Sequence, residues 1–155
     1  MQLSQILTAE RIFVDRTGIV SDKAAVLRVL SEMLAPAVGE ESEQIESRLA
    51  ERERLQSTGI GDGVAIPHSS VEAAAGQSAA LLLCPGGVDF DAIDGALVSI
   101  IFGVVGPKRS TGEHLRTLAR ISRLLRSPAT RDALLHLQNA DEVFAFIERH
   151  DQGLG

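Results

Sequence analysis

Two stretches of the chain are apolar on both faces of any strand that they could form, and they constrain the fold more than any other feature. They span residues 79–83 and 97–105, and turns of the Pro-Gly type, 85–87 and 106–107, bound them. A continuous apolar run between turns is typical of a central strand that is buried on both sides. Such strands need helices over both faces of their sheet.

Helical patterns occur before and after these runs. Apolar residues recur with helical spacing from residue 24 onward, behind an N-cap candidate at Ser21-Asp22, and the pattern stops near Pro36 and Gly39. Further helices are predicted at 43–55, 113–126, 129–137 and 141–147, a short strand at 64–66 and a loop across the glycines at 59–63. Together these elements predict an α/β fold, a three-layer α/β/α sandwich around a mixed sheet of about five strands.

Length and composition exclude several classes of protein. The 155 residues fit one domain, residues 1–155, and a 45% apolar content excludes a disordered chain. Trp and Tyr are absent and the net charge is −6, which argues against nucleic-acid binding. The lone Cys84 cannot form an internal disulfide, and no Cys/His cluster has zinc spacing.

No targeting or membrane signal is visible. The N-terminal segment lacks the basic and apolar regions of a signal peptide, and the longest apolar stretch, 96–105, falls far short of the roughly 20 residues that a membrane span needs. We therefore expect a cytoplasmic protein that does not insert into a membrane.

Basic residues are distributed unevenly along the chain. No Lys or Arg lies between Leu55 and Pro107, whereas seven lie between Lys108 and Arg131. Arg116, Arg120 and Arg123 share a helical face, which is either a solvated surface or a docking surface for an acidic partner.

The densest group of chemically useful residues is Ser57-Thr58-Gly-Ile-Gly-Asp-Gly-Val-Ala-Ile-Pro-His68. A glycine-rich segment leads into a short apolar strand whose end presents a histidine after a rigid proline. A neutral imidazole is a good nucleophile near pH 7 and can form a covalent intermediate. The alternative is a tight turn with an incidental surface histidine. The glycines match neither dinucleotide-binding nor P-loop spacing.

Four segments of the chain resemble the EIIA proteins of the phosphotransferase system. They are residues 52–68, Val88–Gly95, the run that ends at Val105-Gly106-Pro107 and the stretch from His114 to Leu125. The resemblance is to the mannitol/fructose/nitrogen-regulatory type and covers nearly the whole chain. The absence of a fused EIIB or EIIC segment favours the nitrogen-regulatory group. The resemblance thus identifies residues 1–155 as one EIIA domain of this type.

That resemblance implies a phosphotransferase role without a cofactor. His68 falls on the phosphorylated histidine, which accepts a phosphoryl group from an HPr-like phosphocarrier, and Arg52 and His114 fall on active-site positions. The expected recipient is an EIIB domain or a regulatory target protein. Ser57 or Thr58 would either donate a hydroxyl to the phosphate or cap the turn.

Other interpretations remain open at this stage. Arg52 alone would be a solvated ion-pair residue, and His114 a capping or surface histidine. Ser69-Ser70 stand where the family often has a cation, so a regulatory binding module without efficient phosphotransfer is the alternative function. A metal site made of His68 and His114 is a weaker idea, because no carboxylate or cysteine lies at ligand spacing.

Overall fold

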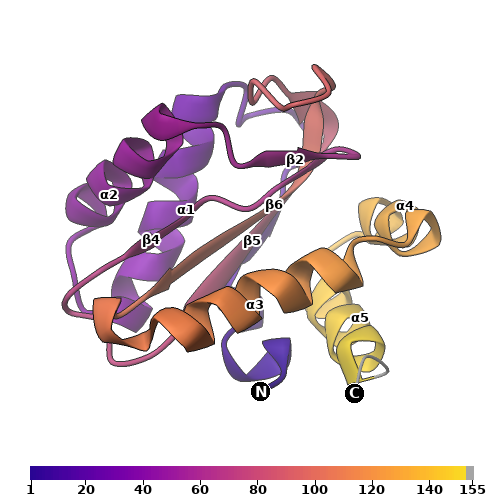
Figure 1. Cartoon of the computed structure of the whole chain (residues 1–155). Coiled ribbons are helices and arrows are strands. Elements are labelled where there is room, and N and C mark those ends of the chain that lie inside the picture. The colour runs from indigo at the N-terminus through magenta and orange to yellow at the C-terminus, as the bar shows by residue number, and fades with distance from the viewer. Residues whose placement is uncertain (153–155) are drawn as a thin grey trace.

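A mixed sheet of six strands runs through the middle of the molecule in the computed structural model, which describes residues 1–152 (Figure 1). Its main path follows the order β1 (Ile12–Val14), β5 (Ser78–Val88), β6 (Val98–Gly106), β3 (Val64–Ala65) and β2 (Gly59–Gly61), and β4 (His68–Ser70) also pairs with β6. Strands β5 and β6 are antiparallel, whereas β1 runs parallel to β5, and β3 and β4 run parallel to β6.

Helices cover both faces of this sheet. On one side lie α1 (Lys23–Val38) and α2 (Ser42–Leu55), and on the other α3 (Thr111–Leu124), α4 (Pro128–His136) and α5 (Ala140–Gln152). Short 3₁₀ helices occur at η1 (Leu3–Gln5), η2 (Ala9–Arg11) and η3 (Lys108–Ser110). The predicted three-layer α/β/α architecture is thereby confirmed.

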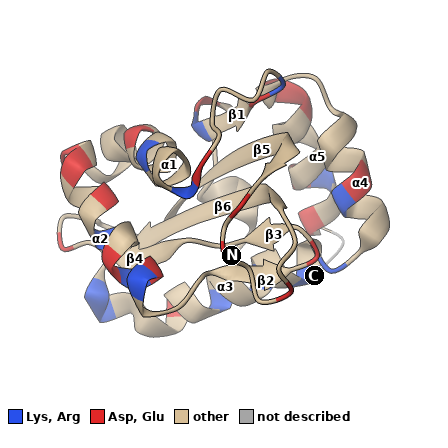
Figure 2. Ribbon diagram, turned by 90° about the horizontal axis from the view of Figure 1, so that it is seen from above, with Lys and Arg blue, Asp and Glu red and all other residues tan. Residues whose placement is uncertain are grey.

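The two long strands bury both of their faces, as their apolar sequences predict. Along β5, Leu81 and Leu83 pack under α3 to α5, while Ala80 and Leu82 pack under α1 and α2. Neither β5 nor β6 carries a charged residue, and Figure 2 shows the positions of charged residues on the helices and loops around them. Because successive side chains of a strand point to opposite faces, the two strands contribute to two apolar cores, one on each side of the sheet.

The ends of α1 follow directly from its sequence. The Asp22 carboxylate accepts a hydrogen bond from the Ala25 N–H at 2.8 Å and so caps the first turn. Gly39 ends the helix with φ +76°, a left-handed conformation that glycine adopts without strain. Pro36 lies inside the last turn, so the helix continues two residues beyond it.

Part of the glycine-rich stretch differs from its prediction. The expected loop is wrong for residues 59–61, which form β2 and pair antiparallel with β3. Asp62 and Gly63 have φ values of +57° and +76°, and two residues of positive φ make the tight turn whose twist suits a hairpin. Strand β5 also continues through 85–87, with an irregular register between Leu83 and Val88, where a turn is expected.

The arginine stripe on α3 is not a uniformly solvated surface. Arg116 and Arg123 are exposed, but Arg120 is buried, with 8% of its surface accessible. Its Nε donates to Asp151 Oδ1 at 2.5 Å, and the other oxygen of that carboxylate accepts from the Leu3 N–H at 2.6 Å. Neither alternative, a solvated surface or a docking surface, holds for Arg120, which instead joins α3, α5 and the N-terminal segment.

No helix among residues 1–152 is long and apolar enough to cross a lipid bilayer.

Candidate functional site

The backbone of the sheet fixes the position of His68. Strand β3 ends at Ala65, and β4 begins at His68 and pairs with the same strand, β6, so that His68 lies opposite Val104. Between them the Pro67 carbonyl accepts from the Val104 N–H at 2.9 Å, and the Thr58 carbonyl accepts from the Ile66 N–H at 3.0 Å. His68 is consequently held by strand pairing on both sides of the Ile66-Pro67 interruption.

One ring nitrogen of His68 already makes a hydrogen bond within the protein. Its Nδ1 lies 2.6 Å from the Ile66 carbonyl oxygen, and because a carbonyl only accepts, Nδ1 carries the proton. Nε2 makes no hydrogen bond within residues 1–152 and is therefore the nitrogen with a free lone pair in the neutral ring.

His114 lies beside His68 although 46 residues separate them in sequence. It sits in the first turns of α3, and the two ring centroids are 5.6 Å apart with the planes tilted by 53°. The His114 Nδ1 is 2.8 Å from Gln77 Oε1. Both histidines are only partly exposed.

The surroundings favour the neutral form of both imidazoles. Burial lowers the pKa of His68, and the positive charge of Arg52 lowers it further, against the opposing effects of the Ile66 carbonyl and the Glu53 carboxylate. Burial also lowers the pKa of His114, and so does neighbouring His68. These effects favour the neutral imidazole, which is the form that can act as a nucleophile.

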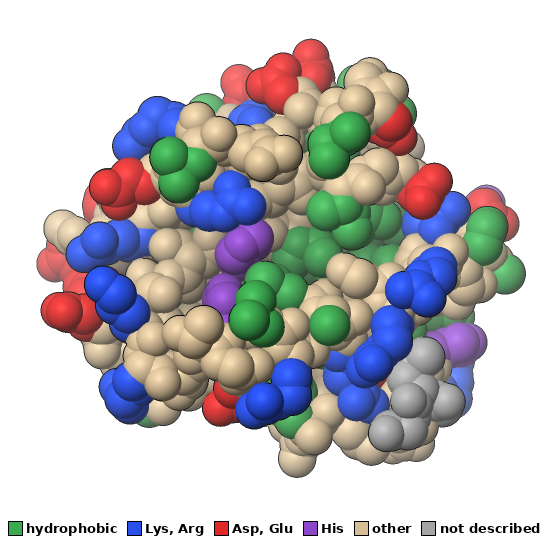
Figure 3. Space-filling model, in the orientation of Figure 1, with side chains coloured by type: hydrophobic (Ala, Val, Ile, Leu, Met, Phe, Trp, Pro, Cys, Tyr) green, Lys and Arg blue, Asp and Glu red, His purple; other side chains and the backbone are tan. Residues whose placement is uncertain are grey.

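Arg52 belongs to the same site. It lies in the last turn of α2, where its Nη1 donates to the Gln56 carbonyl at 2.8 Å. A hollow of about 270 Å³ brings it together with His68, and Figure 3 shows histidine side chains in the middle of this face, between basic side chains and an apolar recess. The other lining residues include Ser57, Thr58, Ile60, Ile66, Ile93 and Leu118. The structure thus brings His68, His114 and Arg52 together.

The two hydroxyl residues of the site both donate to protein acceptors. Ser57 Oγ donates to the Phe90 carbonyl at 2.7 Å and accepts from the Gly59 N–H at 3.1 Å. Thr58 Oγ1 donates to Glu53 Oε1 at 2.5 Å. These contacts correspond to the turn-capping alternative, since neither hydroxyl has a second proton to offer a phosphate.

Glu53 is a positioning residue that the sequence patterns do not single out. Only 7% of its surface is accessible, and its carboxylate accepts from both the N–H and the hydroxyl of Thr58. Lys23 of α1 completes the group, with Nζ 2.6 Å from Glu53 Oε2 and 4.8 Å from the Phe90 ring centroid. In the sequence Glu53 is one of several charged residues on a polar helix, so only the fold reveals this role.

The loop of residues 89–95 packs closely against the glycine-rich hairpin. A Cβ at Gly59 would lie 2.8 Å from the Ala92 Cβ and 3.0 Å from its Cα, so only glycine fits there. Asp94 Oδ2 accepts from the Asp62 N–H at 3.2 Å and its Oδ1 from the Ala96 N–H at 3.0 Å. Asp94 therefore shapes the turn at residues 94–96 and ties it to the hairpin.

Cations reach this region from two elements on either side of Ser69-Ser70. A shallow groove of about 450 Å³ runs past Ser69 and Ser70 and is lined by Arg48 and Arg52 of α2 and by Lys108 of η3. Arg52 lines both this groove and the hollow at His68. The same groove is lined by two carboxylates, Glu51 and Glu72. Residues distant in sequence thus bring both basic and acidic side chains next to Ser69-Ser70.

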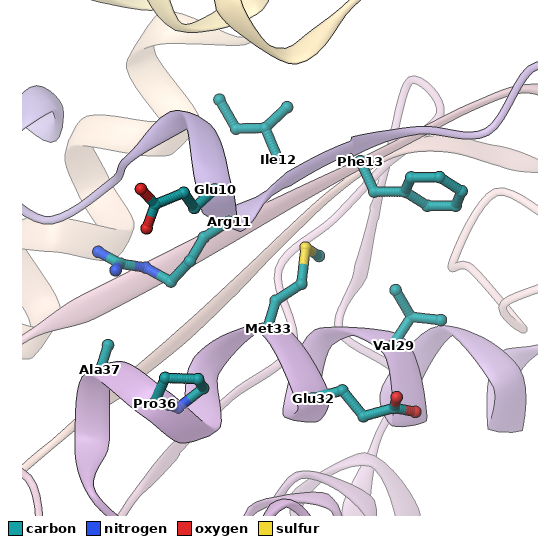
Figure 4. A pocket seen from close by; sticks show the side chains of 9 residues that line it. All are labelled: Glu10, Arg11, Ile12, Phe13, Val29, Glu32, Met33, Pro36 and Ala37. Carbon is teal, nitrogen blue, oxygen red and sulfur yellow. The ribbon is translucent and has the colours of Figure 1, made fainter.

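A larger groove, of about 520 Å³, lies elsewhere, between α1 and the edge strand β1 (Figure 4). Its lining is mostly apolar, with Phe13 and Met33 among the side chains shown. Arg11 is held there by the carbonyls of Ala79 and Ile6, each at 3.0 Å, and burial lowers its pKa. No histidine lines it, and across residues 1–152 no three His, Cys, Asp or Glu side chains form a cluster suited to a metal ion.

Comparison with known proteins assigns the chain to a family. The family model described as "Phosphoenolpyruvate-dependent sugar phosphotransferase system, EIIA 2" matches residues 5–150. The chain belongs to this EIIA family. The match includes the hairpin, His68, Arg52 and His114.

Individual EIIA relatives support the assignment. A nitrogen regulatory protein of Pseudomonas aeruginosa is 34% identical over 148 residues, which is 95% of each chain. The crystal structure of nitrogen regulatory protein IIA-Ntr from Neisseria meningitidis superimposes with a TM-score of 0.85 at 30% identity, over 93% of this chain and 97% of that one. Enzyme IIA of the mannitol system from Escherichia coli, solved in complex with phosphorylated enzyme IIB, shares the fold at 23% identity, with a TM-score of 0.76 over 91% and 96% of the chains.

Proposed function

We propose that this EIIA chain is a phosphohistidine carrier that accepts a phosphoryl group on His68 from an HPr-like protein. One observation carries the proposal: the Ile66 carbonyl fixes Nδ1 of His68 and leaves Nε2 free at a hollow that also contains Arg52. Family membership supplies the reaction class.

The transfer needs no cofactor. The lone pair of His68 Nε2 forms a bond to phosphorus as the bond to the donor's nitrogen breaks, and the donor keeps that electron pair. The proton on Nδ1 stays in place and remains bound to the Ile66 carbonyl. Catalysis of such a step rests on alignment and on charge stabilisation of the equatorial oxygens.

Arg52 and His114 are the groups that we assign to those oxygens. The planar guanidinium of Arg52 presents paired donors that match phosphate geometry. His114 contributes a hydrogen-bond donor when protonated, which a dianionic phosphate beside it promotes. Ser57 and Thr58, whose hydroxyls bind Phe90 and Glu53, would keep the hairpin in place rather than bind phosphate.

The surface around His68 suits protein partners. Large apolar side chains are exposed there, with 49% of Ile60, 74% of Ile93 and 60% of Leu115 accessible. Arg48, Arg52 and Lys108 lie on its other side. Such a combination of apolar contact and positive charge fits a carrier and, afterwards, an EIIB domain or a regulatory target, all of them in the cytoplasm.

A regulatory module without efficient transfer is the second candidate. The nitrogen regulatory protein of Pseudomonas aeruginosa, which matches 95% of this chain, favours signalling as the outcome of phosphorylation. However, Arg52 and Lys108 line the groove beside Ser69-Ser70, together with Glu51 and Glu72, so cations are present there although none follows His68 in the sequence.

Incubation with phosphoenolpyruvate, enzyme I and a phosphocarrier tests the proposal. We expect an acid-labile, base-stable label on the wild-type chain, none on His68→Ala, and normal labelling of His136→Ala, whose histidine is exposed on α4. A label that persists in His68→Ala would refute the assignment of His68 as the nucleophile. No label on the wild type with a cognate carrier would favour the regulatory module.

A further inference from the structure

Gln77 is a buried polar residue that no sequence pattern marks. It precedes β5, and 7% of its surface is accessible. Its Oε1 is 2.8 Å from His114 Nδ1, and its Nε2 has no hydrogen-bond partner in the part of the chain that the structure describes. A buried amide that leaves one donor unpaired is uncommon and calls for a reason.

The space that Gln77 occupies is provided by Gly106 at the end of β6. A Cβ at Gly106 would lie 2.0 Å from the Gln77 Nε2 and 2.5 Å from its Cδ, so any larger residue would displace the amide. Gly106 does not have a positive φ, and its lack of a side chain therefore serves close approach rather than backbone freedom. Gly106 also pairs with Ser70 of β4, two residues beyond His68.

The contact with Gln77 determines which ring nitrogen of neutral His114 carries the proton. An amide oxygen only accepts, so Nδ1 of His114 must be protonated, and Nε2 is the ring nitrogen left free. His68 has the same arrangement, with Ile66 O in place of Gln77 Oε1. In both histidines the protein thus occupies Nδ1 and leaves Nε2 available.

We propose that Gln77 is a positioning residue of the phosphoryl-transfer site, which fixes the tautomer and orientation of His114 through Nδ1 while Gly106 leaves room for its amide. A second proton can then be added at Nε2 without breaking the bond to Gln77, and this turns His114 into a donor for a phosphoryl oxygen. This last step rests on the proposed function, whereas the tautomer does not.

Long-range ¹H–¹⁵N correlation spectra of the unphosphorylated protein test the tautomer directly. We expect the Nδ1–H form of His114 in the wild type and in Gln77→Glu, whose carboxylate also accepts. Gln77→Met keeps a similar volume without an acceptor, and there we expect a shift toward the Nε2–H form that free histidine prefers. Gln44→Met, which changes an exposed glutamine of α2 away from the hollow, is the matched control and should leave the spectrum of His114 unchanged.

Gly106→Ala offers an independent route to the same result. It leaves Gln77 and His114 chemically intact but places a methyl group where the amide lies, so it should shift the His114 tautomer as Gln77→Met does. An Nε2–H tautomer in the wild type, or an unchanged tautomer in a folded Gln77→Met, would overturn the inference.

The rate of phosphoryl transfer then tests whether the positioning of His114 by Gln77 matters for the reaction. Because misplaced groups can slow a transfer strongly, we expect Gln77→Met to accept phosphoryl groups about 10-fold or more slowly than Gln44→Met. If the wild type accepts no phosphoryl group but shows the Nδ1–H tautomer, the proposed function fails and the positioning of His114 stands. If the wild type is phosphorylated and Gln77→Met shifts the tautomer at an unchanged rate, the positioning role in transfer is refuted.

Discussion

Lys23 and Glu53 form an ion pair, 2.6 Å between Nζ and Oε2, and the same carboxylate accepts both the N–H and the hydroxyl of Thr58. The Thr58 carbonyl in turn accepts from the Ile66 N–H, and the Ile66 carbonyl accepts from His68 Nδ1. A continuous series of hydrogen bonds therefore connects α1 and α2 to the ring of the proposed nucleophile.

Glu53→Gln should weaken this series and destabilise the protein. The amide keeps one acceptor but removes the charge that faces Lys23, so we expect a loss of roughly 1–3 kcal/mol in the free energy of unfolding, measured with denaturant. Glu51→Gln is the matched control on the same helix. Glu51 lies 3.9 Å from Arg48 in an exposed pair, which contributes about 0–1 kcal/mol. Equal losses in the two variants would contradict a special role for Glu53.

Arg52→Met should slow phosphoryl transfer without unfolding the protein. Arg52 is partly exposed, and it lines the hollow at His68. Removing one preorganised group that stabilises transition-state charge typically costs about 10²–10³-fold in rate. Arg54→Met serves as a control, because Arg54 is exposed on the same turn of α2 and lines neither hollow. Similar rates for Arg52→Met and Arg54→Met would refute the assignment.

Phosphorylation of His68 should raise the pKa of His114. The ring centroids are 5.6 Å apart, and a nearby dianion favours the imidazolium form. NMR titration of the phosphorylated and unphosphorylated proteins measures the shift. An unchanged His114 pKa would mean that the phosphoryl group does not lie near that ring.

Stability should fall as the solution is acidified through the titration range of the two site histidines. Both pKa values are lowered in the folded state, so between those values and about 6.5 the unfolded chain binds more protons. Unfolding free energy therefore decreases as pH drops through this window and levels off below it. Replacing both His68 and His114 by Gln should flatten that decrease, whereas His136→Gln should not. A double variant with the wild-type slope would rule out this linkage.

Asp151→Asn should destabilise the fold more than any exposed carboxylate change. Asp151 is 1% accessible, and it binds Arg120 and the Leu3 N–H. Leaving a buried arginine without its partner costs about 3–5 kcal/mol. Thermal or denaturant unfolding provides the measurement, and Asp132→Asn, at an exposed position of α4, should change stability by about 0.5 kcal/mol or less. Comparable unfolding midpoints in the two variants would disprove the role of this pair.

Local sequence rules predicted the parts of the fold that depend on local physics. Asp22 and Gly39 bound α1 because capping and positive φ are properties of single residues. The two apolar runs became β5 and β6 because their burial needs only an uninterrupted apolar pattern.

Features that depend on distant contacts were missed. Strand β1 has three residues and exists through its pairing with Leu81–Leu83, while Arg120 is buried because Asp151 comes back to it from α5. Within the site, the family motif led to His68, His114 and Arg52, but Glu53 and Gln77 become visible only once Thr58 and His114 are placed in three dimensions.

The bond between His68 Nδ1 and the Ile66 carbonyl has a kinetic consequence for the proposed carrier. With one nitrogen committed to the backbone, a phosphoryl group must arrive at and leave from the same atom, Nε2, on the same face of the molecule. Donor and recipient then compete for a single surface and bind in alternation. Steady-state rates should accordingly follow a ping-pong pattern, in which an excess of either partner in its unphosphorylated form slows turnover.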